Sequence, residues 1–162
     1  MGRPVRYVIE VDLDNSLTVS FRTDNQATYE IRFRDSDYLF PTLPELTGCI
    51  FEFVLALVKR PPGILLAPDS RIAPTVMAAI TDFLKADPNR VITCICDSSD
   101  RRELARKRKF DQWFDTFATH DFRKQEGTLT DTDGISFYIA ALWLQTHLLT
   151  DQIAVAFNDL AD

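Results

Sequence analysis

Cysteine, histidine and glycine are scarce in this sequence of 162 residues, which has three, two and five of them. Cys49, Cys94 and Cys96 form no C-x-x-C pair, and their odd number excludes a small scaffold held by disulfides. We expect reduced and buried thiols. His120 and His147 form no H-x-x-H or H-x-x-x-H pair, so the sequence predicts no metal site.

Long apolar runs are also missing. No stretch reaches the roughly 18 apolar residues of a membrane span, and residues 1–14 lack the apolar segment of a signal peptide. Hydrophobic residues make up 46% of the chain and charged residues 26%, which excludes a disordered or low-complexity chain. We therefore expect a single cytoplasmic globular domain over 1–162, with no membrane as partner.

Positive charge is concentrated in one segment. The chain has 18 Lys and Arg against 24 Asp and Glu, a net charge of −6, but SDRRELARKRKF (99–110) has six basic and two acidic residues. The net charge of this segment is +4, which leaves a net charge of −10 for the rest of the chain. Such an acidic body argues against a protein that coats nucleic acid. Arg101, Arg102 and Arg106 are candidates for an anion or partner site. The alternative is a solvated helix face whose cations pair with acids on neighbouring strands.

Alternating apolar residues predict an antiparallel meander of three strands over 5–13, 17–22 and 28–34. Asp14-Asn15 and Asp24-Asn25 are typical turn residues between them, and the acid pairs Asp12 with Asp14 and Asp131 with Asp133 also indicate turns. In the irregular stretch 35–48 we expect an anchor of three residues that tuck into the core: Tyr38, Leu39 and Phe40. Residues 49–60 are apolar on both faces, which is typical of a central strand in a covered sheet.

The apolar spacing changes to three and four residues after Asp69, which predicts a helix capped by Asp69 or Ser70 with Pro74 in its first turn. A buried strand over 91–96 follows, and Asp100 with Glu103 fits the capping box of a second helix that runs to about residue 118. The later half of that helix is expected to bury four aromatic residues: Phe110, Trp113, Phe114 and Phe117.

The last third of the chain predicts a hairpin and a terminal helix. Asp133-Gly134 is a turn signal between strands at 122–130 and 135–145. A helix over 136–149 stays open as an alternative, because Ala, Leu and Gln favour one. Thr150 is the expected cap of the terminal helix.

This order of elements resembles the N-acetyltransferase superfamily, most closely from residue 49 onward. The resemblance implies a helix N-terminus that cradles the pyrophosphate of coenzyme A, in a loop that reads Q/R-x-x-G-x-G/A. Arg71 matches the first position, whereas Pro74 and Val76 replace the small residues. The segments DSRIAPT (69–75) and CICDSSDRRELARKRKFDQWF (94–114) are also similar to those of a small bacterial family of unknown function.

The sequence thus predicts a single-domain α+β protein whose mixed, mostly antiparallel sheet joins a meander (1–34) to a β-α-β-α-β-β-α core (49–162). Candidate cofactor-binding residues are Arg71, Ala73, Thr75, Asp97, Ser98 and Ser99. We expect a non-catalytic binding or regulatory protein that needs no cofactor, with an unknown protein or a small anionic ligand as partner, because the loop is altered and no catalytic constellation replaces it. The alternatives are an acyl-coenzyme A-dependent N-acyltransferase that uses acetyl-coenzyme A, and a nucleotide- or nucleic-acid-binding module based on residues 101–109.

Overall fold

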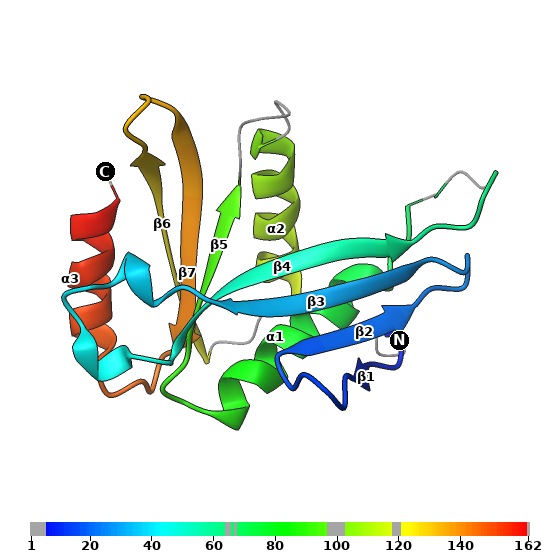
Figure 1. Ribbon diagram of the computed structural model, residues 1–162, viewed down its shortest axis with the longest axis horizontal. Helices are drawn as coiled ribbons and strands as arrows, with labels where there is room; N and C mark the ends of the chain where they lie inside the picture. The colour runs from blue at the N-terminus through cyan, green and yellow to red at the C-terminus, as the bar shows by residue number, and fades with distance from the viewer. Residues whose placement is uncertain (1–5, 64–65, 67, 97–102, 118–120, 162) are drawn as a thin grey trace.

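The computed structural model describes residues 6–63, 66, 68–96, 103–117 and 121–161, which form one seven-stranded mixed sheet with three α-helices (Figure 1). The strand order is β1-β2-β3-β4-β5-β7-β6, and only β4 and β5 are parallel neighbours. The mixed α+β prediction is confirmed. In chain order the strands and α-helices are β1 (Glu10–Val11), β2 (Thr18–Arg22), β3 (Thr28–Asp35), β4 (Ile50–Lys59), α1 (Ile72–Ala86), β5 (Val91–Cys96), α2 (Glu103–Phe117), β6 (Phe122–Thr130), β7 (Ser136–Leu144) and α3 (Thr150–Leu160).

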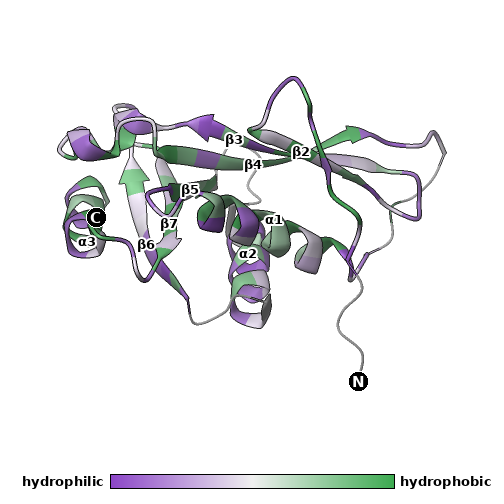
Figure 2. Cartoon of the chain, turned by 90° about the horizontal axis from the view of Figure 1, so that it is seen from below, coloured by the Kyte–Doolittle hydropathy of each residue, from purple (hydrophilic) through white to green (hydrophobic). Residues whose placement is uncertain are grey.

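Each face of the sheet carries its own core. One core joins the apolar side of the meander, including Phe21 and Ile31, to α1 and to aromatic residues of α2 such as Phe110. The other core joins α3 and the loop 36–49 to the opposite side of β5 and β7, where Trp143 and Phe157 are fully buried. Figure 2 shows hydrophobic colour along α1 and the central strands, and more hydrophilic colour on α2. Within the described ranges, no helix is long and apolar enough to span a membrane.

The central strands β4 and β5 separate after a short parallel ladder. Their Cα register covers Ile50 with Val91, Phe51 with Ile92, and Glu52 with Thr93, and stops there. Beyond this ladder β4 pairs with β3 along its other edge, and β5 pairs with β7 as far as its last residue. The sheet is therefore open along the two facing edges at its centre.

The predicted hairpin is confirmed, and the alternative helix over 136–149 is wrong. Strands β6 and β7 pair over their whole length, from Phe122–Leu144 to Thr130–Ser136. Asp131 organises the turn, because its Oδ1 accepts the N–H groups of Asp133 and Ile135, both at 2.9 Å. Gly134 has a φ of +80°, a conformation that glycine adopts without steric cost. The aromatic and apolar residues of β7 then fill both cores, which outweighs the helix propensity of Ala and Leu.

The first expected strand is much shorter than its alternation indicates. Only Glu10 and Val11 pair with β2, and Leu13 is almost fully exposed. Residues 6–9 lie outside the sheet: Tyr7 is buried, and its N–H donates to Thr75 Oγ1 of α1 at 2.8 Å. At this edge of the sheet, packing of Tyr7 against α1 therefore replaces pairing with β2.

Three further local predictions need correction. Tyr38 is 70% exposed, so only Leu39 and Phe40 anchor the irregular stretch. The residue at the N-cap of α1 is Arg71, and that of α3 is Leu149, so the expected side-chain caps do not form. Thr150 Oγ1 instead accepts the indole N–H of Trp143 at 2.7 Å, which satisfies a buried donor.

Candidate functional site

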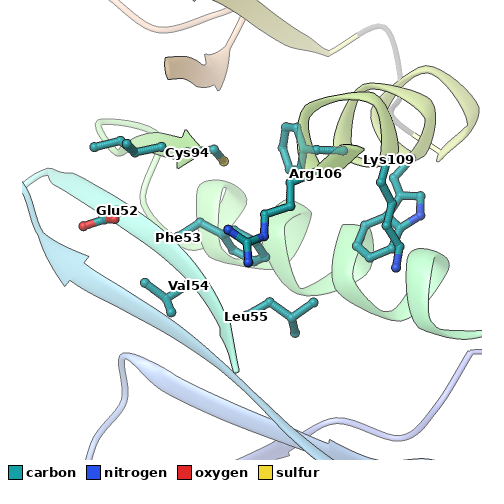
Figure 3. Close-up of a pocket in the computed structure, with 10 residues that line it drawn as sticks. Glu52, Phe53, Val54, Leu55, Cys94, Arg106 and Lys109 are labelled. Atoms are coloured by element: carbon teal, nitrogen blue, oxygen red, sulfur yellow. The ribbon is translucent and has the colours of Figure 1, made fainter. Parts of the chain in front are cut away.

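A cleft of about 420 Å³ lies where β4 and β5 diverge, and α2 closes one side of it (Figure 3). Its lining combines apolar side chains from β4 and α2 with one carboxylate and two cations. The lining residues are Glu52, Phe53, Val54, Leu55, Cys94, Ile95, Arg106, Lys109, Phe110 and Trp113. A largely apolar concave site with a few polar groups is the usual form of a small-molecule pocket.

One face of α2 supplies the cations of the cleft. Arg106, Lys109, Phe110 and Trp113 follow each other at three- and four-residue spacing, which places them on one side of a helix. In Figure 3, Arg106 extends from α2 into the space between this helix and β4. The Lys109 Nζ lies 5.2 Å from the ring centroid of Trp113, a cation–π contact. The cleft therefore has an apolar interior and a positively charged border.

A second cavity, of about 600 Å³, adjoins the same pair on α2. Lys109 and Trp113 line both cavities, and the second one continues along Tyr29 to the beginning of α1, where Ser70 and Ala73 contribute to its wall. The two cavities thus lie on either side of the Lys109–Trp113 pair, which borders both.

The side chains predicted to bind a pyrophosphate at α1 are engaged within the protein. Arg71 Nη1 lies 2.7 Å from the Asp24 carboxylate, and its guanidinium stacks 3.9 Å from the ring centroid of Tyr7. The Thr75 hydroxyl accepts the Tyr7 N–H and donates to the Arg71 carbonyl. Asp69 Oδ1 accepts the Arg71 N–H at 2.9 Å, which brings a carboxylate to the place where an anion would sit.

Tyr7 adds a further contact to this arrangement. Its hydroxyl donates to Asp69, and both burial and this hydrogen bond raise the pKa of Tyr7 above its ordinary value. Pro74, which lies in the first turn of α1, has no N–H to offer. The beginning of α1 is thus held by the protein's own groups, and the candidate residue Ala73 lines the second cavity.

A charge cluster on another side of α2 attaches this helix to the hairpin. Lys107 Nζ lies 2.7 Å from Asp111, Lys124 of β6 also binds Asp111, and Glu126 lies 2.7 Å from Lys124. Burial raises the pKa of the Asp111 carboxyl, but hydrogen bonds from both lysines outweigh this effect and lower the pKa to about 2. Lys107 Nζ also lies 3.4 Å from Glu126 of β6, so the interpretation in which the basic segment pairs with acids on a neighbouring strand is confirmed for Lys107.

The structure brings one predicted anion-binding residue, Arg106, to the cleft, while Arg101, Arg102, Asp97, Ser98 and Ser99 lie outside the described residues. The sequence reasoning missed Lys109 and Trp113 as lining residues. It also missed the contribution of β4. A usable signal was present: β4 has ten residues and β5 has six, so part of an apolar central strand had to lack a parallel neighbour.

Comparison with known proteins identifies the family. Residues 68–159 match a family of unknown function, DUF6169, and the chain belongs to this family. The matched region contains β5, α2 and the β6–β7 hairpin, whereas β4 precedes it. This agrees with the expected family of unknown function. No curated protein and no solved structure matches the chain.

Proposed function

We propose that this protein binds a small anionic ligand with an apolar part, without catalysing its conversion, on an acetyltransferase-like scaffold. The observation that carries the proposal is the cleft between β4 and β5, where Phe53, Leu55 and Phe110 form an apolar interior beside Arg106 and Lys109. An apolar chain gains from burial in such an interior. An anionic head gains from two nearby cations.

The arrangement of the sheet supports the scaffold. Two parallel central strands joined by a helix, and followed by a second helix and a hairpin, have the order that the resemblance to the N-acetyltransferase superfamily implies. In that superfamily the helix after the first central strand cradles the coenzyme A pyrophosphate. By its place in the chain α1 would correspond to that helix, and Tyr7, Asp69 and Asp24 lie around its beginning. These contacts favour a head group held at α2 and a binding protein over a transferase.

Acyl-coenzyme A and related acyl anions have the required chemistry. The acyl chain would lie against Phe53, Leu55 and Phe110, and the phosphates would lie near Arg106 and Lys109. The second cavity, which shares Lys109 and Trp113 with the cleft and reaches Tyr29, offers space for the rest of a larger ligand. The two cavities together exceed what a simple inorganic anion would need.

Isothermal titration calorimetry with octanoyl-coenzyme A tests the proposal. The double variant Arg106→Ala with Lys109→Ala should weaken binding about tenfold, because it removes both charged hydrogen-bond donors. Arg108→Ala is the matched control, since Arg108 is exposed on the same helix and does not line the cleft. Absence of binding at millimolar ligand would contradict the proposal. Binding that Arg71→Ala abolishes would place the phosphates at α1 instead.

An acyltransferase is the second candidate, and Glu52 is the observation in its favour. Glu52 is the acidic residue among those that line the cleft, and a carboxylate is the group that would act as a general base there. The assay is release of free thiol from acetyl-coenzyme A in the presence of a mixture of amines. Turnover that Glu52→Gln abolishes, with binding unchanged, would establish the transferase over the binding protein.

A further inference from the structure

We propose that the groove beside α3 binds a basic amphipathic helix of a partner protein. This groove, of about 410 Å³, lies between α3 and the loop before β4, on the sheet face opposite to α1 and α2. Its residues combine exposed carboxylates and an amide with apolar side chains: Thr42, Leu43, Asp151, Gln152, Val155, Ala156 and Asp159. The inference is independent of the ligand proposed for the cleft.

The groove exposes apolar surface that the fold itself does not cover. Val155, which lies in the middle of α3, is 60% exposed. Leu43 and Ala156 continue the apolar surface toward the buried core, where Leu46 and Phe157 lie. Exposed apolar side chains grouped around a groove are a feature of interaction sites.

Charge defines the partner. The residues that line the groove include two carboxylates, Asp151 and Asp159, and no lysine or arginine. Asp151, Val155 and Asp159 are spaced by four residues, so the two carboxylates lie on one stripe of α3 with the apolar residue between them. A partner with apolar side chains flanked by lysine or arginine matches this pattern.

A helical partner matches the spacing of the two carboxylates on α3. The two carboxylates are eight residues apart on α3, which corresponds to about 12 Å along the axis. Two cations separated by two helical turns in the partner span nearly the same distance, and the side chains between them face Val155. Docking of an amphipathic helix into an apolar groove is an established mode of recognition.

The basic helix α2 of a second copy is a poorer occupant. Its aromatic residues Phe110, Trp113 and Phe114 pack against its own sheet, so it would offer cations without the matching apolar side chains. A contact between α2 of one copy and α3 of the next is also heterologous, and such contacts build open chains unless the rotation closes a ring. We therefore assign the groove to a different protein.

Fluorescence anisotropy with a labelled Leu/Lys amphipathic helix of about 15 residues tests this assignment, with a scrambled peptide of the same composition as reference. Asp151→Asn combined with Asp159→Asn should weaken binding at least about fivefold. The control, Asp82→Asn combined with Asp115→Asn, removes two exposed carboxylates from α1 and α2 and should change affinity less than about twofold. Val155→Ser should also weaken binding, whereas Val11→Ser, at a site of equal exposure, should not.

Three outcomes would overturn the proposal. Equal effects of the two double variants would mean that the peptide responds only to net charge. Equal affinity for the scrambled peptide would show that the groove does not recognise an amphipathic helix. A salt-sensitive dimer of the protein alone, abolished by the Asp151 and Asp159 substitutions in sedimentation experiments, would assign the groove to a second copy.

Discussion

Lys124 on β6 donates a hydrogen bond to the carboxylate of Asp111 on α2. This contact joins the helix that borders the cleft to the edge strand of the sheet. The side chain of Lys124 is only 13% exposed and also approaches the rings of Phe110 and Phe114. Loss of its acceptor would leave a largely buried ammonium group with Glu126 alone. The position of α2, and with it the shape of the cleft, therefore depends on this pair.

We expect Asp111→Asn to lower the free energy of unfolding by about 1–2 kcal/mol, because an amide cannot balance the charge of the half-buried Lys124 and Lys107. Urea denaturation measures the change. Asp115→Asn is the control, since Asp115 is exposed on the same helix and its loss should cost less than about 0.5 kcal/mol. Equal effects of the two substitutions would show that the pair does not hold α2.

The same carboxylate predicts how stability changes in acid. The folded-state pKa of Asp111 is about 2, below the ordinary value of 3.8, so the folded protein binds the proton less readily than the unfolded chain. The contribution of Asp111 is therefore fully present above about pH 4 and is lost as the pH falls toward 2. Urea midpoints measured from pH 5 to pH 2 should converge for the wild type and Asp111→Asn. A constant difference over that range would contradict this assignment.

The contact between Tyr7 and Thr75 predicts a different kind of loss. Thr75→Val keeps the shape of a fully buried side chain but removes the acceptor of the Tyr7 N–H. We expect a cost of about 1–2 kcal/mol and faster hydrogen exchange at the Tyr7 amide, since an unsatisfied buried donor is expensive. Thr81→Val is the matched control on the same helix, because the Thr81 hydroxyl bonds only to the Met77 carbonyl in its own helix. Unchanged exchange at Tyr7 would refute the expected role of Thr75.

Sequence patterns predicted the fold well where one signal dominated. The turn at Asp133-Gly134 and the aromatic, β-branched start of the segment after it correctly predicted the β6–β7 hairpin. The alternation over 5–13 failed, because burial of Tyr7 against α1 removes that segment from the sheet. Such a contact joins residues 68 positions apart, and local periodicity contains no information about it.

The candidate site was less accessible to sequence reasoning. The helical spacing of Phe110 and Trp113 correctly indicated packing toward the core, but it could not show that Trp113 also borders a cavity. The cleft arises because β4 extends beyond its ladder with β5, and this depends on how far two strands stay paired. Arg106 was found through local charge, whereas Lys109 was treated as part of a solvated face. Only the position of α2 beside β4 in the folded protein shows that both side chains line the cleft.

Trp113 provides a direct optical test of the cleft. The chain has two tryptophans, and Trp143 is fully buried, so Trp143→Phe leaves Trp113 as the only indole. We expect octanoyl-coenzyme A to shift the Trp113 emission to shorter wavelength, because an acyl chain in the cleft removes water from the ring. The shift should saturate with the calorimetric Kd. Lys109→Gln should raise that Kd about threefold or more by removing one cation from the border. Unchanged emission at ligand concentrations that saturate the calorimetric signal would mean that the ligand binds outside this cleft, and the proposed site would have to be abandoned.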